Sequence, residues 1–458
     1  MSIESRTEAT RTTSGAGAIS NGQLSELREA FETNRNWRNA QNAVTQVGVD
    51  EVALNRSVIN TTDHTFSHLL DDWAVTNQKM TGRCWMFAGL NLFRVGAMQK
   101  MGLKEFEFSQ AHTLFYDKLE RSNYVLEAMI ELADRPLDDR TVAFLLDRPL
   151  EDGGQWNMFV NLVRKHGLVP KSFMPETESS SNTRRLNSIL WYKLREGART
   201  LRERRAMGAS VEDLREEKLG MMAEIHRILC IHLGTPPETI EWQWTDTDGN
   251  FHRDEVMTPQ QFAETYITIP LDEYVCLVHD PRRTSPLGRT YTVEYLGNVV
   301  GGEIVTYLNV DAELMKQIAR DTIVGGEPVW FGCDVGKMMQ RNLGVWDREL
   351  FEYDAVYETS FSLDKAERLD YHETLMTHAM LFTGVDVADG VSRRWRVENS
   401  WGEENGKKGF FVMNDNWFSE YTFEIAARRS MLPADLQAAL DQPPIVLPAW
   451  DPMGALAR

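Results

Sequence analysis

Apolar residues recur at helical spacing through the first half of the chain. Between Cys84 and Met101 they form one stripe, made of Phe87, Leu90, Phe93 and Ala97. A stripe with a period near 3.6 residues predicts a helix that starts at Cys84. Gly102 follows at the position where a C-terminal cap is expected.

The same pattern predicts further helices along this half. They cover Gln23 to about Val44, most of Ser109–Leu146, the residues between Gly153-Gly154 and Gly167, the charged stretch Ser181–Leu233, and a short segment that starts at Thr258-Pro259. The charged stretch predicts a helical pair. Its outer face is either solvated or packed against a partner, and the sequence leaves both alternatives open.

The pattern changes after about Leu271, where short β-prone runs alternate with turns. Strands are expected at Tyr274–Val278, Val293–Leu296, Glu303–Leu308, Val329–Gly332, Thr377–Val385, Trp395–Asn399 and Gly409–Asn414, with a helix from Asp311. Asp389-Gly390 and the segment NGKKG have turn chemistry. The chain is therefore expected to be α+β, with a mainly helical first half and mainly antiparallel strands in the second.

Five regions follow from these changes in pattern. They are a disordered N-terminal tail (1–22), a mainly helical half with Cys84 (23–180), a charged helical insertion (181–270), a mainly β half with His378 and Asn399 (271–432), and a C-terminal arm (433–458). The end of the arm, DQPPIVLPAWDPMGALAR, has four prolines in 18 residues. Proline fixes φ and removes a donor, so this segment should run extended.

Charge and cysteine content narrow the possible partners and location. The 458 residues carry a formal charge of −19, from 49 basic and 68 acidic residues, which disfavours nucleic acid as the main partner. Four widely spaced cysteines without a CxxC pair do not form a disulfide framework and favour a reducing compartment. No signal peptide and no apolar run of about 20 residues is found, so a cytoplasmic location without membrane contact is expected.

One of these cysteines has the setting of a nucleophile. Cys84 is predicted at the first turn of its helix, and Gly82 permits the tight turn that precedes it. A thiol reacts as the thiolate, so its pKa must fall below about 8.5. The free N–H groups and dipole of a helix start favour the thiolate, and a nearby imidazolium favours it further.

A base and its orienting group are predicted on two later strands. His378 lies in THAMLFTGVD, and Asn399 ends the strand in RWRVENSWG. A hairpin that turns at Asp389-Gly390 would bring the two together, so that the Asn399 amide oxygen accepts the imidazole N–H. Trp401 would shield this hydrogen bond from water.

An oxyanion donor is available as well. Gln78 lies six residues before Cys84, and its side-chain amide with the Cys84 backbone N–H would stabilise a tetrahedral oxyanion. Together these residues predict acyl transfer through a thioester.

The motifs resemble those of a known family. The pattern Q-x5-C-W-x-F, a strand histidine and N-S-W-G is similar to the papain superfamily, and nine positions match: Gln78, Cys84, Trp85, Phe87, His378, Asn399, Ser400, Trp401 and Gly402. Within it, QKMTGRCWMFAGLN, EDGGQWNMF, VENSWGEENGKKGFFVMNDNWF and LPAWDPMGALA resemble the bleomycin hydrolase and bacterial aminopeptidase C family. Cys84 and His378 are 294 residues apart, against roughly 130–150 in papain-like chains. The helical insertion and the added strands are consistent with this excess.

The resemblance implies a fold and an activity. The fold would be papain-like, with a helical subdomain carrying the nucleophile, an antiparallel β-barrel subdomain, a helical insertion and an extended arm. The activity would be that of a thiol aminopeptidase, acting on peptides and aminoacyl amides through Cys84, His378 and Asn399, without cofactor or metal. The resemblance also implies a homohexamer.

The resemblance assigns substrate contacts too. Gly153 and Gly154 would pair with an extended substrate, which can lie close only where no Cβ intrudes. The C-terminal arm would enter the cleft, where its terminal carboxylate meets the substrate's free amine and limits cleavage to free N-termini. Removal of Arg458 would expose Ala457 for this contact.

Three other interpretations of the motifs would give the chain a different function. A metal enzyme would use His64, His68, His372 and His378, but HTFSH lacks the glutamate of HExxH. An inactive papain-like scaffold and an acyl transferase that uses another acceptor are the other two. The remaining cysteines, Cys230, Cys276 and Cys333, are expected to be core residues.

Overall fold

The computed structural model describes residues 17–70 and 73–456. Within this part the chain forms two compact units. The first contains the residues up to Ser57 together with Glu349–Ser362, and the second contains Val58–Arg348 and the residues from Leu363 onward. Residues 1–16, which hold most of the predicted N-terminal tail, lie outside the described residues, and so do Ala457 and Arg458.

The first unit is helical. It contains α1 (Asn21–Thr33), α2 (Arg35–Val44), α3 (Val49–Ala53) and α14 (Tyr353–Tyr357), and α4 (Arg56–Thr61) continues from it into the second unit. The single helix predicted over Gln23–Val44 is wrong, because Asn34 interrupts it. The Asn34 side chain accepts hydrogen bonds from the backbone N–H groups of Asn36 and Trp37 and so starts a second helix.

The helices of the second unit follow the predicted ones closely. They are α5 (Cys84–Met101), α6 (Gln110–Glu131), α7 (Arg140–Asp147), α8 (Trp156–His166), α9 (Glu178–Ser181), α10 (Arg184–Ala206), α11 (Val211–Leu233) and α12 (Pro259–Tyr266). The helix predicted from Cys84 to Met101 is confirmed, and Gly102 caps it with φ of 63°. Thr258 caps α12 through a capping box, as its sequence predicts.

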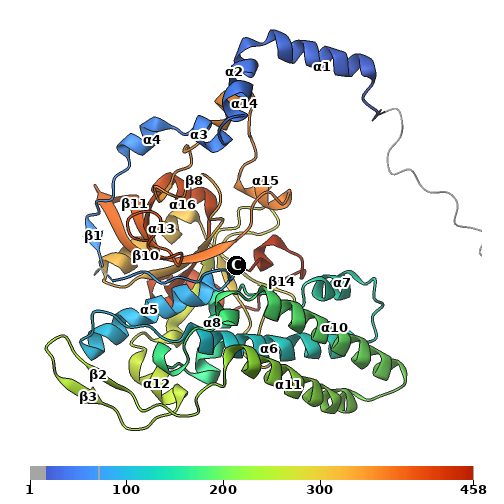
Figure 1. Ribbon diagram of the computed structural model, residues 1–458, viewed down its shortest axis with the longest axis vertical. Coiled ribbons are helices and arrows are strands. Elements are labelled where there is room, and N and C mark those ends of the chain that lie inside the picture. Colours follow the sequence, from blue (N-terminus) through green and yellow to red (C-terminus); the bar gives the residue numbers. More distant parts are fainter. Residues whose placement is uncertain (1–16, 71–72, 457–458) are drawn as a thin grey trace, which may run out of the picture. The chain divides into compact units, whose positions relative to one another are not determined.

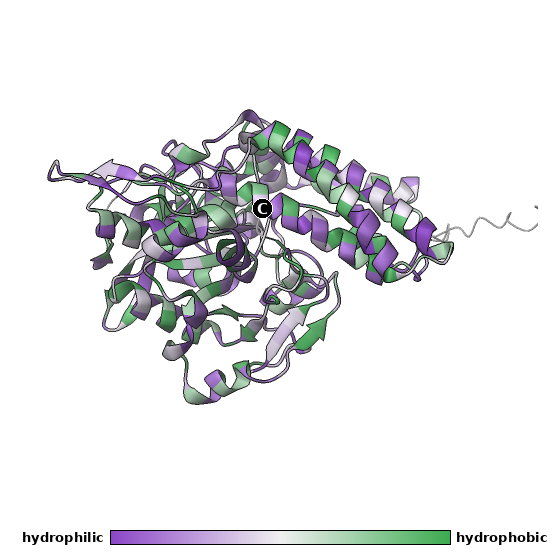
Figure 2. Ribbon diagram, turned by 90° about the horizontal axis from the view of Figure 1, so that it is seen from below, coloured by the Kyte–Doolittle hydropathy of each residue, from purple (hydrophilic) through white to green (hydrophobic). Residues whose placement is uncertain are grey.

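The charged stretch forms two long antiparallel helices that pack against the chain's own α6. Figure 1 shows α6, α10 and α11 side by side. The inner faces are apolar and buried, through Leu190, Leu194 and Leu201 of α10 and Leu214 and Leu229 of α11. Figure 2 shows apolar and polar residues alternating along these helices. The stretch is therefore an amphipathic layer on the protein's own core.

A mixed sheet forms the other half of the second unit. Its strands are β4 (Tyr274–Val278), β5 (Thr290–Val293), β6 (Tyr307–Asn309), β7 (Val329–Cys333), β8 (Met339–Gln340), β9 (Val345–Trp346), β10 (His378–Ala388), β11 (Val391–Glu398), β12 (Phe410–Asn414), β13 (Thr422–Arg428) and β14 (Ile445–Leu447). β1 (His68–Leu69) pairs with β10, whereas β2 (Gln243–Thr245) and β3 (Phe251–Arg253) form a separate hairpin.

The sheet differs from the predicted antiparallel barrel in two respects. Three neighbouring pairs are parallel, namely β4 with β6, β5 with β14 and β9 with β12. Among the described strands the pairing runs in one open order, β14-β5-β6-β4-β13-β7-β10-β11-β12-β9-β8, so these pairings do not close a barrel. The second half of the chain also holds α13 (Ala312–Val324), α15 (Lys365–Asp370), α16 (Asp415–Tyr421) and α17 (Ala434–Leu440).

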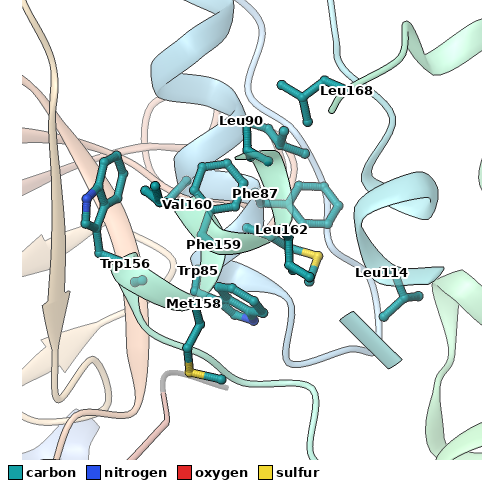
Figure 3. Packing of buried hydrophobic residues seen from close by; sticks show 14 of the residues in the cluster. Trp85, Phe87, Leu90, Leu114, Trp156, Met158, Phe159, Val160, Leu162 and Leu168 are labelled. Atoms are coloured by element: carbon teal, nitrogen blue, oxygen red, sulfur yellow. The ribbon is translucent and has the colours of Figure 1, made fainter. Parts of the chain in front are cut away.

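The sheet separates two apolar clusters. Ala379 and Leu381 of β10 contact the cluster that includes α5, α6 and α8, whereas Met380 and Phe382 contact the cluster on the other face. Figure 3 shows the first cluster around Trp85, whose ring packs edge-on against Phe159 at 6.4 Å. Phe159 belongs to α8 and Trp85 follows Cys84, so this packing fixes the start of α5 against α8.

The C-terminal arm lies along the second unit. β14 adds parallel to β5, and a single 3-10 turn at Pro452–Gly454 interrupts the predicted extended course. A buried ionic cluster holds the arm, because Arg282 pairs with Asp280 at 2.8 Å and with Asp451 at 2.9 Å. Removing one partner of a buried pair is costly, so this cluster is a firm anchor.

Within residues 17–70 and 73–456, no helix combines the length and the apolar character needed to cross a membrane.

Candidate active site

Cys84 is the first residue of α5, and its thiol is buried. The backbone N–H of Ala379 on β10 points to Cys84 Sγ at 3.4 Å, which places the sulfur beside the strand that carries His378. Burial raises the pKa of the Cys84 thiol to about 12, although backbone N–H groups of Ala379, Trp85 and Cys84 itself act in the opposite direction. The backbone N–H groups at the helix start therefore favour the thiolate, whereas desolvation by burial disfavours it.

His378 and Asn399 meet across the predicted hairpin. β10 and β11 are antiparallel and turn at Asp389-Gly390, where both residues have positive φ. His378 Nε2 and Asn399 Oδ1 are 2.9 Å apart, which leaves Nδ1 as the ring nitrogen that can serve the thiol. The Trp401 ring lies 5.0 Å from the His378 ring between centroids, so it covers one side of the imidazole.

Burial acts on the imidazole as it does on the thiol, by disfavouring charge. It lowers the pKa of His378 to about 4, and the hydrogen bond to Asn399 opposes this shift. A proton that moves from Cys84 to His378 leaves the net charge of the pair unchanged. The buried pair can therefore become thiolate and imidazolium together, although burial opposes each charge alone.

Gln78 is held in the same buried region. Its backbone N–H donates to the Ser400 carbonyl at 2.8 Å, and its side-chain oxygen accepts from the Ser400 hydroxyl at 2.6 Å. Its amide Nε2 donates to the Thr81 carbonyl at 2.6 Å. Ser400, which follows Asn399, thus holds the predicted oxyanion donor Gln78. The Gln78 side-chain N–H points to the turn before Cys84.

Gly153 and Gly154 are buried, and this segment lies against Trp85, the residue after Cys84. Trp85 Nε1 donates to the Asp152 carbonyl at 2.6 Å. A Cβ built at Gly154 would lie 2.5 Å from the Trp85 indole, closer than real carbon contacts. Close packing on Trp85 therefore requires a glycine at position 154, whatever that backbone also does for a substrate.

The end of the arm reaches this glycine segment. Gln155, directly after Gly154, donates through Nε2 to the Ala455 carbonyl at 2.6 Å. Leu456 packs against the apolar cluster of α5 and α8. The predicted contact residues Ala457 and Arg458 lie outside the described residues, and Ala455, just before them, contacts Gln155 next to Gly154.

Glu398 is a site residue that the sequence analysis missed. Its buried carboxylate accepts hydrogen bonds from Trp73 (2.6 Å), Asn91 (2.9 Å) and Arg94 (2.8 Å). Asn91 and Arg94 belong to α5, so one carboxylate connects the helix of Cys84 to β11, which ends at Glu398 directly before Asn399. A charged residue at a strand position next to Asn399 was the available signal.

Arg341 is a second missed residue. It follows β8, and its guanidinium carbon lies 4.5 Å from the centroid of the Trp401 ring. It is also a charge that lowers the pKa of His378, after burial as the main cause. Its sequence context, MQRNLGVW, carries no motif that would single it out.

This grouping of a helix-start thiol, an imidazole and an orienting amide defines a site of the cysteine peptidase class. The chain belongs to the Peptidase C1-like family, whose model matches residues 18–454. The matched range includes Gln78, Cys84, His378 and Asn399.

Several relatives are similar to this chain over nearly its whole length. Bleomycin hydrolase from Gallus gallus is 45% identical, over 92% of this chain and 94% of its own. Bleomycin hydrolase from Homo sapiens is 42% identical, with 97% and 100% covered. Aminopeptidase C from Streptococcus thermophilus is 43% identical, with 96% and 99% covered.

A solved structure has the same fold. The crystal structure of PepW from Lactobacillus rhamnosis superposes with a TM-score of 0.94 at 45% identity, over 96% of this chain and 100% of that one. The predicted membership of the bleomycin hydrolase and aminopeptidase C group is confirmed, and the chain is a cysteine-type aminopeptidase, a hydrolase.

Proposed function

We propose that this chain removes N-terminal residues from peptides and aminoacyl amides through a thioester formed on Cys84. The placement of Cys84 at the start of α5, beside a His378 that is paired with Asn399, carries this proposal. The thiol gives its proton to His378 Nδ1, and the sulfur attacks the first peptide carbonyl. The imidazolium then protonates the leaving amine and afterwards takes a proton from the water that hydrolyses the thioester.

Asn399 and Gln78 have supporting roles in this mechanism. The Asn399 oxygen would accept the Nε2–H of His378, which leaves Nδ1 to take the proton of the thiol. Gln78 and the Cys84 backbone N–H would stabilise the oxyanion, because the Gln78 Nε2 has a second N–H besides the one that it donates to the Thr81 carbonyl. Loss of one such donor typically lowers kcat by about 10²–10³-fold.

The arm would confine the cleft to peptides with a free N-terminus. The contact between Gln155 and Ala455 supports an arm that runs beside Gly154, along the course proposed for an extended substrate. An arm in that place blocks residues on the N-terminal side of the scissile bond. The names of the bleomycin hydrolase relatives support amides of the bleomycin type as further substrates.

We also propose an assembly and a location for the chain. Exposed apolar side chains on the outer faces of α10 and α11, such as Tyr192, Leu219 and Ile231, support contacts between copies in a homohexamer. All four cysteines are free thiols, which supports a reducing compartment such as the cytoplasm.

The nucleophile can be tested directly. A Cys84→Ala variant should lose turnover of an aminoacyl fluorogenic amide by about 10⁶-fold, to background, because removal of a nucleophile abolishes the covalent route. Its thermal unfolding midpoint should stay near that of the unmodified chain. The matched control is Cys230→Ala, which removes a partly exposed thiol of α11 and should keep full activity. Turnover retained by Cys84→Ala would refute the assignment.

A further inference from the structure

Arg341 presents a charge at the edge of the catalytic site that the mechanism above does not use. Its side chain is exposed, and its guanidinium lies 4.5 Å from the centroid of the Trp401 ring. That ring lies 5.0 Å from the His378 ring. Stacking on an indole holds a guanidinium in place while its N–H donors remain free for a ligand.

The described residues supply no carboxylate for this cation. Within residues 17–70 and 73–456, Arg341 forms no ion pair, whereas many of the chain's other arginines do form one. The chain as a whole carries a charge of −19, so carboxylates are abundant elsewhere on it. An unpaired guanidinium beside the catalytic histidine is therefore available to an anionic group of the substrate.

The chemistry of the reaction decides which part of the substrate meets it. His378 must protonate the leaving amine, so the residue after the scissile bond starts at the imidazole. In the proposed function the arm, which contacts Gln155 through Ala455, takes the N-terminal side of the scissile bond. The Trp401 ring contacts both the His378 ring and the Arg341 guanidinium, so a leaving segment that ran from His378 across Trp401 would reach Arg341.

We propose that Arg341 binds a carboxylate carried by the substrate one or two residues beyond the scissile bond. This inference rests on the proposed function of the site and identifies its preferred substrates as short peptides with a free C-terminus or peptides with an acidic residue there. The reach is sufficient, because the 5.0 and 4.5 Å ring distances laid end to end are an upper bound on the separation of the His378 ring from the Arg341 guanidinium. One or two extended residues of about 3.5 Å each, with a hydrogen bond of about 3 Å at either end, cover that separation.

The test compares substrates that differ by one charge on the leaving side. Alanyl-alanine is compared with alanyl-alanine amide, and alanyl-aspartic acid amide with alanyl-asparagine amide, by release of N-terminal alanine. The unmodified chain should cleave the charged member of at least one pair with the higher kcat/KM. The preference is the ratio of kcat/KM for the charged substrate to kcat/KM for its uncharged partner. The Arg341→Gln variant should lower this ratio by about fivefold, which is the range of an exposed charge-assisted contact. Added salt should reduce the ratio in the unmodified chain.

The outcomes separate this inference from the function on which it rests. If the unmodified chain releases no alanine from any of the four substrates, the proposed function fails. If it cleaves them and Arg341→Gln leaves both ratios unchanged, the function stands and the role of Arg341 is overturned. The first pair reports a terminal carboxylate, and the second an acidic side chain.

Two further variants serve as controls. Lys407→Gln removes an equal charge from an exposed neighbouring loop and should leave the ratios unchanged. Arg341→Lys keeps the charge but loses the planar stack, and should retain part of the preference. An equal loss of preference in Lys407→Gln would show a general charge effect and would overturn the assignment to Arg341.

Discussion

The thiol of Cys84 and the imidazole of His378 are both buried, and their charges depend on each other. Burial raises the pKa of the thiol to about 12 and lowers that of the imidazole to about 4. Each group alone would be neutral at pH 7. In the proposed mechanism the thiolate of Cys84 therefore forms by transfer of its proton to His378, because burial separates both groups from solvent.

This dependence predicts a difference in alkylation between the unmodified chain and a His378→Ala variant. With His378 present, Cys84 should react with iodoacetamide at neutral pH, at a rate that changes little between about pH 6 and 8. Without it, the thiol keeps its raised pKa. The rate at Cys84 should then be low at neutral pH and rise about tenfold per pH unit, because only the thiolate reacts.

Peptide mapping by mass spectrometry separates Cys84 from the other thiols. Cys230, which is partly exposed, serves as the internal control and should show the same profile in both proteins. Equal profiles for Cys84 in the two proteins would mean that His378 is not its base.

Among the elements, the helices were predicted better than the strands. The helix from Cys84 to Met101 was predicted because a turn, a stripe and a glycine cap are local signals. The strand predicted at Val293–Leu296 forms at Thr290–Val293 instead, where its partners β6 and β14 pair with it. Parallel pairing joins segments far apart in sequence, and no local pattern encodes the partner.

The site was predicted where its residues carry motifs, and missed where they act through distant contacts. Cys84, His378 and Asn399 each have a recognisable local setting. Glu398 and Arg341 acquire their roles from α5 and Trp401, which only the folded chain brings to them. Cross-chain hydrogen bonds and ring stacking of this kind leave no spacing in the sequence.

The proposed role of the C-terminal arm predicts that shortening the arm changes which peptides are cleaved. A variant that lacks residues 454–458 loses the contact between Gln155 and Ala455 but keeps Asp451 and its pair with Arg282. It should cut N-acetylated peptides internally, at least about tenfold faster than the full chain, because blocked substrates can then extend past Gly154.

The same peptides with free N-termini provide the control, measured by mass spectrometry of the products. If the shortened chain still cleaves free peptides but leaves acetylated ones intact, the arm does not restrict the cleft.

At the scale of the whole molecule, the outer faces of α10 and α11 are the surface to test. Their inner faces pack on α6, yet Leu219 and Ile231 are 68% and 75% exposed on the outside of α11. Apolar groups in these positions are typical of an interface. If copies associate there, a charge at each position should weaken the assembly.

The prediction is a lower mass in solution for Leu219→Asp with Ile231→Asp than for the unmodified chain, measured by light scattering after gel filtration. Leu137→Asp, which changes another exposed leucine outside these helices, should leave the mass unchanged. A monomeric unmodified chain, or equal masses for all three proteins, would count against an assembly through this face.

The carboxylate of Glu398 also determines when during synthesis the site can exist. It is followed directly by Asn399, and both leave the ribosome long after α5 with its Arg94. Synthesis starts at the N-terminus and proceeds at about 5–20 residues per second. For many seconds the Cys84 thiol therefore exists without His378 and without the bond between Arg94 and Glu398. The nascent polypeptide thus carries no working peptidase while its own termini and loops are still unfolded. Activity begins only when there is little unfolded chain left to digest.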